Sequence, residues 1–431
     1  MPIMTSVQAD ERRPAIPRSN ALWGVGDQAV SMASNFLLTV IVARVSSPRD
    51  FGLFTLTMAG FILVLGVARA VVSEIVIIRH AVLDIDEQQV AYRQALGATA
   101  AIAVPLAVIF LAAEAAIFGS LGSVTVIIFV ALAPLLLQDA ARFLLITVGQ
   151  ARLAFYNDMA WLVLELVGFA AVLELAGHGR QTELVVAAWA VAGAACALIA
   201  LRQLRSFPHL AGGAHWLRRN ADLSWPAVVE FLSGQGAAQL VLFIVSAGVG
   251  VEAAGGWRGA FVLFGPLGVL TTGLGMAIVP ALARQFHDGD RSSALRTCLV
   301  AAAVVAGASA LLGLVLTFNL FSIGSELLGK TWPLAAAVMA PVAVQKTLEA
   351  FSLGAVVGLR GASLVSRSMR VRLVLAALSI AVASFSFATT SLRPVAWGQA
   401  AVMSIGLVLF WLQLVRHVRN TPAKHRVAGR T

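Results

Sequence analysis

The stretch ARVSSPRDFGLFTLT (Ala43–Thr57) separates two long apolar runs with a short cluster of proline, charged residues and glycine. A related interruption, VGVEAAGGWRGAF (Val249–Phe261), occurs about half a chain later. A shift of 204 residues places Gly52 on Gly256, and each stretch follows the first apolar run of its half and opens the second. Proline ends one helix and is tolerated at the start of the next. We therefore expect equivalent tight turns in an internally repeated chain.

The composition indicates that most of the chain lies in lipid. Hydrophobic residues make up 59% of the sequence, charged residues only 12%, and the mean hydropathy is +0.88. Soluble domains carry about 25% charged residues. Cys196 and Cys298 lie in or beside apolar runs, which does not support a disulfide scaffold.

Twelve apolar runs approach the roughly 20 residues that a helix needs to cross a bilayer. They are 22–43, 51–72, 93–118, 122–148, 158–176, 183–203, 223–248, 258–284, 293–318, 333–358, 371–388 and 395–416. We therefore expect an all-α integral membrane protein with about 12 transmembrane helices in two pseudo-symmetric six-helix lobes. The predicted order is a cytoplasmic N-terminal tail at 1–21, an N-terminal lobe at 22–203, a cytoplasmic linker at 204–222, a C-terminal lobe at 223–416 and a cytoplasmic basic tail at 417–431.

A second correspondence supports the repeat. APLLLQ (Ala133–Gln138) and APVAVQ (Ala340–Gln345) are 207 residues apart, and each lies in the fourth apolar run of its half. The offsets of 204 and 207 agree within about one helical turn. Because each half has an even number of spans, the two halves insert in the same orientation, related by an axis along the membrane normal.

Lysine and arginine predict the orientation, since they accumulate in cytoplasmic loops. With the N-terminus inside, 22 of the 31 basic residues lie on the inner side, 6 on the outer side and 3 within spans. We therefore expect both termini in the cytoplasm. The same distribution explains the pI near 11.0, helped by attraction to anionic lipid headgroups. It argues against a nucleic-acid partner, which would need this charge on a soluble domain.

Three stretches resemble a known family. ARVSSPRDFGLF (Ala43–Phe54) is similar to the first-loop signature of polysaccharide biosynthesis membrane proteins, the O-antigen flippase-like branch of the multidrug/oligosaccharidyl-lipid/polysaccharide (MOP) exporter superfamily. GGWRGAFVLFGPLGVLTTGLGMAIVPALAR (Gly255–Arg284) resembles the matching second-half segment, and ELLGKTWPLA (Glu326–Ala335) a third short stretch.

The resemblance implies a fold and a function. The fold is a V-shaped transporter with two lobes around a central cavity. The function is flipping of an undecaprenyl-pyrophosphate-linked oligosaccharide from the inner to the outer leaflet of the cell inner (cytoplasmic) membrane. This would serve lipopolysaccharide or exopolysaccharide biosynthesis, with membrane lipids and other polysaccharide-assembly proteins as further partners.

One stretch matches a nucleotide-binding motif. GSELLGKT (Gly324–Thr331) fits the phosphate-loop pattern G-x-x-x-x-G-K-T, which binds phosphates where it follows a strand and opens a helix. Here it follows an apolar helix in a predicted outer loop, without an α/β domain around it. We interpret it as a helix-connecting turn and expect no nucleotide partner and no cofactor.

Enzyme motifs are otherwise missing from the sequence. There is no H-E-x-x-H and no paired-cysteine motif, and the seven histidines are scattered, mostly in loops and tails. A membrane enzyme would need a sizeable polar loop or intramembrane histidines, and the outer loops are short. We therefore expect no enzyme activity, no catalytic residue and no metal site.

Charges inside the apolar runs supply the candidate site residues, because each is costly in lipid and usually faces a cavity or a partner. The candidate substrate-binding residues are Arg69, Arg142 and Lys346, and the candidates for ion coupling or charge pairing are Asp27, Asp139, Glu230 and Glu349. Asp139/Arg142 and Lys346/Glu349 are each spaced i, i+3, which places both members of a pair on one helix face. At an offset of 207 residues the pairs align with their signs exchanged.

We hypothesise that both pairs contribute to a central cleft, with Arg69 nearby. Arg142 and Lys346 would hold the anionic pyrophosphate, as arginine and lysine do generally. Once the substrate leaves, they would pair with Asp139 and Glu349, within or across lobes. The alternative is that each pair neutralises itself and serves only packing.

Asp27 and Glu230 lie 203 residues apart, in equivalent places of the first and seventh runs. This equivalence suggests a role in ion or proton coupling. Two other interpretations stay open: Asp27 and Arg69 sit at the membrane interface, or Glu230, like Glu165 in the fifth run, is protonated and hydrogen-bonded between helices.

Two further function classes remain beside the flippase. A cation-coupled exporter of small molecules or drugs from the same superfamily would need a carboxylate-dominated cavity, and the buried cations Arg142 and Lys346 argue against it. A membrane scaffold without transport activity would need neither a charged cavity nor a repeat.

The predicted orientation can be tested by labelling single introduced cysteines. A cysteine at Ala211, in the linker, should react only with reagents that reach the cytoplasm, because the linker follows an even number of spans. A cysteine in the Gly324–Lys330 loop should react from outside. Labelling of the Ala211 position from outside would reverse the topology.

Overall fold

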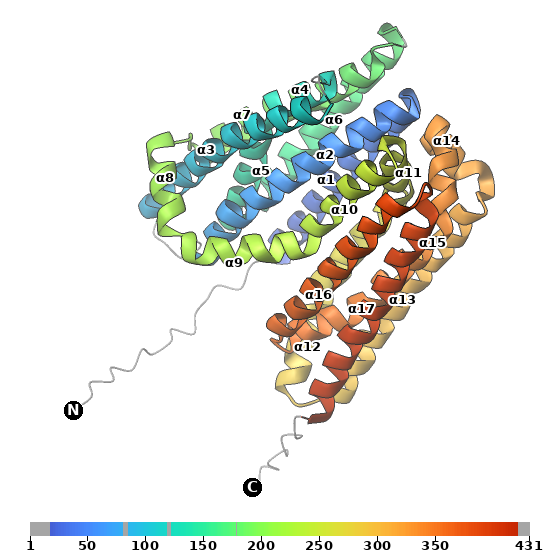
Figure 1. Cartoon of the computed structure of the whole chain (residues 1–431). Helices are drawn as coiled ribbons and strands as arrows, with labels where there is room; N and C mark the ends of the chain where they lie inside the picture. Colours follow the sequence, from blue (N-terminus) through green and yellow to red (C-terminus); the bar gives the residue numbers. More distant parts are fainter. Residues whose placement is uncertain (1–17, 81–84, 119–121, 178, 421–431) are drawn as a thin grey trace.

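The computed structural model describes residues 18–80, 85–118, 122–177 and 179–420, and every regular element in these ranges is helical (Figure 1). The first half contains α1 (Arg18–Val45), α2 (Pro48–Ala68), the π-helical segments η1 (Arg69–Ser73) and η2 (Val76–His80), α3 (Ile85–Phe118), α4 (Ser123–Val130), α5 (Leu132–Thr147), α6 (Ala151–Leu175) and α7 (Gln181–Leu204). Two helices, α8 (Leu210–Arg219) and α9 (Ala221–Phe231), follow.

The second half continues directly from α9 through a third π-helical segment. Its elements are η3 (Leu232–Gly236), α10 (Ala237–Gly248), α11 (Val251–Val262), α12 (Gly265–His287), α13 (Arg291–Thr317), η4 (Leu320–Ser322), α14 (Ile323–Leu328), η5 (Gly329–Thr331), α15 (Trp332–Gly361), α16 (Val365–Ser384), η6 (Phe385–Ala388) and α17 (Leu392–Asn420). The prediction of an all-α membrane fold is confirmed.

The number of membrane spans is slightly lower than the predicted twelve when length and hydropathy alone decide. Ten helical stretches among the described residues meet both criteria, and α4 with α5, which meet at 46°, make an eleventh. The remaining predicted span, 158–176, corresponds to α6. This helix has 25 residues and buries Asn157, Asp158 and Glu165 inside the first lobe.

The quoted stretch Ala43–Thr57 forms the turn between α1 and α2. Ser47 caps α2, because its hydroxyl accepts a hydrogen bond from the backbone N–H of Asp50 at 3.1 Å and donates one to the Asp50 carboxylate at 2.6 Å. Pro48 occupies the first helical position, where its missing N–H costs nothing. The corresponding turn between α10 and α11 depends on Gly250, whose φ of 122° is accessible mainly to glycine.

These two turns bring the lobes into contact through glycine. A Cβ atom on Gly52 of α2 would collide with the backbone of Val251 at the start of α11. A Cβ on Gly255 of α11 would lie 3.0 Å from the Cα of Gly52. The contact partner is thus Gly255, one position before the alignment partner Gly256, which instead packs against Leu334 of α15. The interrupted stretches of the repeat therefore form the contact between the two lobes.

Further contacts join the lobes beside this glycine contact and along α1. α1 packs on α12 and α14, and α2 packs on α10. At the end of α1, Arg44 donates a hydrogen bond to the Glu326 carbonyl of α14. Figure 1 shows the lobes meeting at this end and diverging toward the opposite end, where α9, α12 and α16 lie. The V shape that the family resemblance implied is present.

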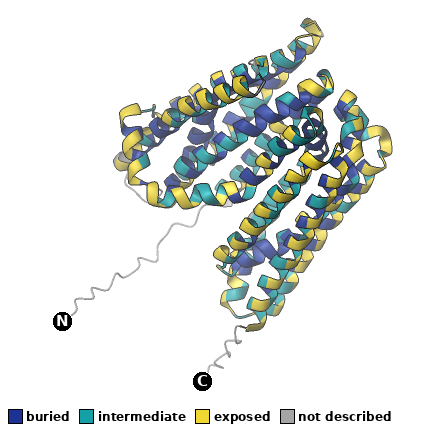
Figure 2. Cartoon of the chain, viewed as in Figure 1, coloured by how far each residue is buried: buried dark blue, intermediate teal, exposed yellow. Residues whose placement is uncertain are grey.

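Each lobe has its own buried interior. In Figure 2 the buried residues lie mainly between the helices of each lobe, and exposed residues cover the outward faces. The outward faces carry many large apolar side chains, among them Val163, Leu198 and Leu311. Exposed aliphatic residues on long helices are what a lipid-facing surface requires.

The segment between the lobes is helical and packs on the first lobe. α8 lies against α3, with Gly213 beside the backbone of Gly97, and the Trp216 indole N–H donates to the Val71 carbonyl at 3.3 Å. Arg79 donates to the Asn220 side chain at 3.0 Å. α9 then packs on η1, so residues 223–231, assigned to the second lobe by sequence, lie against the first.

The phosphate-loop-like stretch Gly324–Thr331 forms α14 and η5, which pack against α1. The ring of Trp332 occupies the space beside Gly324, and Thr331 is fully buried. The stretch follows the helical segment η4, so it lacks the strand that precedes a phosphate loop.

The glycine contact predicts a selective loss of stability. Gly52→Ala should destabilise the protein by about 1–3 kcal/mol, because the added methyl meets backbone atoms that cannot rotate away. Gly307→Ala on α13 is the control: its Cβ would meet open space, so the change should be neutral or stabilising. Thermal unfolding of the detergent-solubilised variants measures both. Equal melting temperatures for the two variants would contradict the close contact.

Candidate functional site

A buried charged cluster lies inside the first lobe and is centred on Arg142 of α5. Its Nη1 donates to Asp27 of α1 at 3.2 Å and to Asp158 of α6 at 3.1 Å, and its Nη2 donates to Asp139 at 3.1 Å. Arg142 is only 2% exposed. One guanidinium therefore connects three helices through three carboxylates.

A second guanidinium completes this first-lobe cluster. Arg69, at the start of η1, binds the Asp139 carboxylate in a bidentate manner, with Nε–Oδ2 and Nη2–Oδ1 distances of 2.8 and 2.7 Å. The two guanidiniums lie 5.3 and 5.2 Å from the ring centre of Phe143. Gln138 donates to Asp158 at 2.8 Å. Bidentate pairs with aromatic contacts fix geometry strongly.

The first-lobe cluster holds three carboxylates against two guanidiniums, which leaves an excess of one negative charge when all are ionised. The Asp27 Oδ1 atom is buried without a hydrogen-bond partner in the described structure. Nearby, Ser34 donates to Glu165 at 2.8 Å, and the other Glu165 oxygen is likewise buried and unpartnered. An unpaired buried charge is expensive, and the two guanidiniums leave one negative charge of the cluster uncompensated when all of its groups are ionised.

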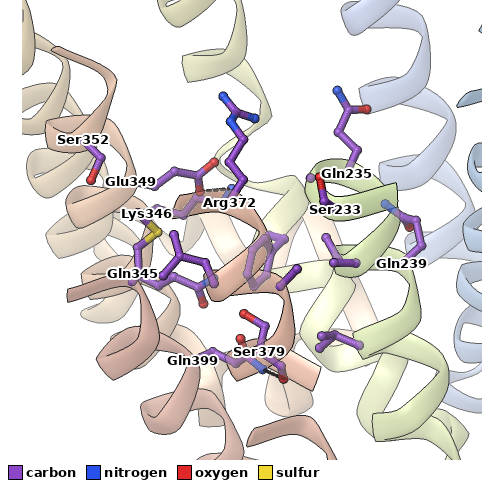
Figure 3. Close-up of a pocket in the computed structure, with 18 of the residues that line it drawn as sticks. Ser233, Gln235, Gln239, Gln345, Lys346, Glu349, Ser352, Arg372, Ser379 and Gln399 are labelled. Carbon is purple, nitrogen blue, oxygen red and sulfur yellow. Dashed lines mark hydrogen bonds and ion pairs between the residues drawn. The ribbon is translucent and has the colours of Figure 1, made fainter. Parts of the chain in front are cut away.

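The second lobe contains a cavity of about 520 Å³ bounded by η3, α10, α11, α15, α16 and α17 (Figure 3). Its charged lining residues are Arg258, Lys346, Glu349 and Arg372. Lys346 and Glu349 form an ion pair of 2.8 Å along α15. Lys346 Nζ also lies 4.8 Å from the ring centre of Phe261. The ring of Phe261 stacks on that of Trp257.

The balance of charge in this second-lobe cavity is positive. Within the described ranges, the structure gives Arg258 and Arg372 no ion pair or hydrogen bond, and Glu349 is the only acid among the lining residues. Three cations therefore face one carboxylate. Glutamine side chains add polar atoms: Gln239 Oε1 and Gln345 Oε1 are buried without a partner, while Gln399 donates to the Ser379 carbonyl at 2.8 Å.

The predicted site residues fall into two separate groups. Arg69, Arg142, Asp27 and Asp139 come together in the first lobe, and Lys346 and Glu349 come together in the second. Both i, i+3 pairs form within their own helices, and no ion pair in the described structure joins the two groups. Glu230 lies exposed on α9 and forms no ion pair in the described structure, but it is near enough to Arg372 of the second-lobe cavity to attract it electrostatically.

Three residues of these two sites, each near the edge of a predicted span, are not among the candidates that the sequence supplied. Asp158 begins the run 158–176, and Arg258 and Arg372 were counted as loop charges. The repeat contains a signal for one of them: the offset of 207 that aligns the two pairs also places Glu165 on Arg372. A third position thus exchanges acid for base between the lobes.

Metal binding has no support from side-chain geometry. Among the residues that the structure describes, no group of three or more His, Cys, Asp or Glu side chains is arranged to hold a metal ion. The chemistry that the two sites offer is electrostatic: sealed ion pairs in the first lobe, and a positive, amide-lined cavity in the second.

The free energy of unfolding should distinguish the first-lobe charges from the Lys346–Glu349 pair. Arg142→Gln should cost about 3–5 kcal/mol, because it leaves buried carboxylates without their counter-charge. Lys346→Gln should cost less than about 1 kcal/mol, because Lys346 is partly exposed and its partner Glu349 is more than half exposed. Folded yield in the membrane and thermal unfolding in detergent report both values. A small effect for Arg142→Gln would show that the cluster is not an ionised network.

Comparison with known proteins shows which solved structures share this fold. No protein-family model matches the sequence, and no curated protein matches it. Several solved structures do match this chain. The lipid II flippase MurJ, in an inward closed conformation, matches with a TM-score of 0.70 and 11% identity over 92% of this chain and 87% of that chain. A MOP superfamily transporter from Pyrococcus furiosus, with a binding pocket of reverse polarity, matches with a TM-score of 0.62 and 14% identity, covering 94% and 95%.

A third match is a multidrug resistance MATE family transporter of the MOP superfamily in an inward-facing conformation, with a TM-score of 0.61 and 14% identity over 93% of this chain and 94% of that chain. Identities this low establish the fold and nothing finer. The chain therefore has the membrane-embedded, two-lobed helical fold of the MOP transporter superfamily.

Proposed function

We propose that this protein is a transporter that flips a lipid-linked oligosaccharide, carried on undecaprenyl pyrophosphate, across the cytoplasmic membrane for polysaccharide biosynthesis. The observation that carries the proposal is the positive second-lobe cavity. Among the described residues, Arg258 and Arg372 form no ion pair, although Glu230 and Glu349 lie near Arg372, and the partner of Lys346 is more than half exposed. A site of this kind is stabilised by an anionic ligand.

The chemistry of pyrophosphate matches these three cations. Arginine presents several N–H donors in a planar fork that binds phosphate oxygens in pairs, and lysine adds a compact positive charge. The low dielectric of the cavity strengthens each interaction relative to water. Cations that await a ligand are costly while the site is empty, and the Glu349 carboxylate beside Lys346 limits this cost.

The proposed orientation places the glycine contact at the outer side of the membrane. Both termini and the α8 segment would then be cytoplasmic, and the lobes would be closed outside and spread inside. Arg372 lies seven residues from the start of α16, on the side that this orientation places toward the cytoplasm. A substrate made in the inner leaflet would therefore meet the charged part of the cavity first.

The first-lobe cluster has a different role in this proposal. Arg69 and Arg142 are occupied by carboxylates, so we assign them to holding α1, α2, α5 and α6 together, and Lys346 alone keeps its predicted part in substrate binding. Asp27, with its unpartnered Oδ1, is the group we assign to proton or cation coupling. Transport would then use an ion gradient, without nucleotide and without catalysis by the chain itself.

One observation favours the alternative function. The excess of carboxylates in the first lobe resembles what a cation-coupled exporter of small molecules needs, and one fold neighbour is a multidrug transporter. The cavity argues against this alternative, because a positive lining repels the cationic compounds that such exporters commonly carry. A membrane scaffold would need neither site.

Loss of a cavity cation should slow transport strongly without unfolding the protein. In cells lacking the gene, lipid-linked oligosaccharide should accumulate in the inner leaflet, and the wild-type gene should clear it. Arg372→Ala should cut the clearance rate at least tenfold, as loss of hydrogen bonds from a charged group to phosphate predicts. The matched control is Arg370→Ala, on the same helix but exposed and outside the cavity lining.

Two results would contradict this proposal. The first is the absence of any lipid-linked sugar from the accumulated material in the deletion strain. The second is normal clearance by Arg372→Ala, Arg258→Ala and Lys346→Ala when each variant is present in the membrane at the wild-type level.

A further inference from the structure

The second-lobe cavity contains acceptors that phosphate cannot satisfy. Gln239 of α10 is only 8% exposed, lines the cavity, and has its Oε1 buried without a hydrogen-bond partner. Gln345 of α15 presents a second buried, unpartnered Oε1 to the same cavity. A buried polar atom without a partner costs free energy, so such atoms normally bond to a ligand or to water. Phosphate oxygens accept hydrogen bonds and have none to donate at neutral pH.

The side chains around these acceptors suit a ring-shaped polar ligand. Trp257 and Phe261 stack on each other at 5.8 Å along α11 and give the cavity an aromatic wall. Gln399 of α17 is held in place by its hydrogen bond to the Ser379 carbonyl. Few, fixed polar groups beside aromatic surface are typical of small-molecule recognition. A ligand with hydroxyl or amide N–H donors and one apolar face would match both features.

The polar groups are separated along the cavity. In Figure 3 Lys346, Glu349 and Arg372 lie toward one end, Gln399 and Ser379 lie at the other, and Gln345 and Gln239 lie between them. Arg372 and Ser379 are seven residues apart on α16, which is about 10 Å along a helix. The charged part and the amide part are thus far enough apart for two different chemical groups of one ligand.

We propose that the amide-lined part of the second-lobe cavity is a carbohydrate subsite, in which Gln239 and Gln345 accept hydrogen bonds from the hydroxyl or acetamido groups of the sugar. This inference rests on the proposed function and deepens it. The phosphates stay on Arg372 and Lys346 while the sugar lies deeper in the lobe. In the proposed orientation the headgroup enters the lobe sugar first, and the two glutamines select the carrier lipid that bears a sugar over the bare carrier.

Binding of two defined probes to the full-length, detergent-solubilised protein tests the subsite. The probes are undecaprenyl pyrophosphate and the same lipid carrying one N-acetylglucosamine. The wild type should bind the sugar-bearing probe at least fivefold more tightly, as one to two added hydrogen bonds predict. Gln239→Leu combined with Gln345→Leu should remove this difference and leave the affinity for the bare probe unchanged. Gln203→Leu is the matched control, because Gln203 also has a buried, unpartnered Oε1 but lies on α7, outside the cavity.

Thermal unfolding without ligand shows whether the double variant has a folding defect. Replacing an unsatisfied buried amide by leucine is neutral or stabilising, so the double variant should melt at or above the wild-type temperature. Equal affinity of the wild type for both probes, or an equal loss for both probes in the double variant, would overturn the subsite. Arg372→Ala should weaken both probes alike. Unchanged binding of both probes by Arg372→Ala would instead refute the proposed function, so the two failures are distinguishable.

Discussion

The close contact between Gly52 and Gly255 is the constraint on which the arrangement of the lobes depends. Van der Waals packing is the main force between helices in lipid, and only small residues let backbones approach this closely. Here the contact joins the second helix of each repeat, where a turn of the first lobe meets the equivalent turn of the second. Because the lobes touch mainly at this end, their opposite ends are free to diverge, and the V shape follows from a few missing side-chain atoms (Figure 1).

The repeat places opposite charges at equivalent positions, and the two lobes deal with them differently. Asp139, Arg142 and Glu165 of the first lobe correspond to Lys346, Glu349 and Arg372 of the second. In the first lobe, Asp139 and Arg142 gain the additional partners Arg69, Asp27 and Asp158, whereas Glu165 accepts a hydrogen bond from Ser34 and forms no ion pair in the described structure. In the described part of the second lobe, Lys346 pairs with Glu349, and Arg372 has Glu230 and Glu349 nearby without an ion pair to either. A reversal of charge sign at these three positions thus accompanies a buried ion-pair network in the first lobe and a positively lined cavity in the second.

The fold was largely predictable because hydropathy and repeated turns are local properties of the sequence. Proline, glycine and an offset of about 204 predicted two equivalent turns, but the contact of these turns with each other, with Gly255 rather than Gly256 against Gly52, required the structure. Side-chain partners were not predictable in the same way. Asp158 of α6 contacts Arg142 and Gln138 on another helix, α5, and helix rotation decides whether a charge points into a lobe or toward lipid. Arg142 therefore required the structure to be recognised as a buried partner of three carboxylates.

The α9–η3–α10 segment links the lobe contact to the cavity. α9 packs on η1 of the first lobe, held beside it by the contacts of Arg79 with Asn220, whereas α10 packs on α16 of the second lobe. Rotation of the lobes about the Gly52–Gly255 contact must therefore deform the segment between them. That segment is η3, a π-helical stretch with two glycines, Gly234 and Gly236, and π-helical turns are weaker points of a helix. η3 also forms one wall of the cavity, so any change in the angle between the lobes changes the shape of the site that holds Arg372 and Gln239.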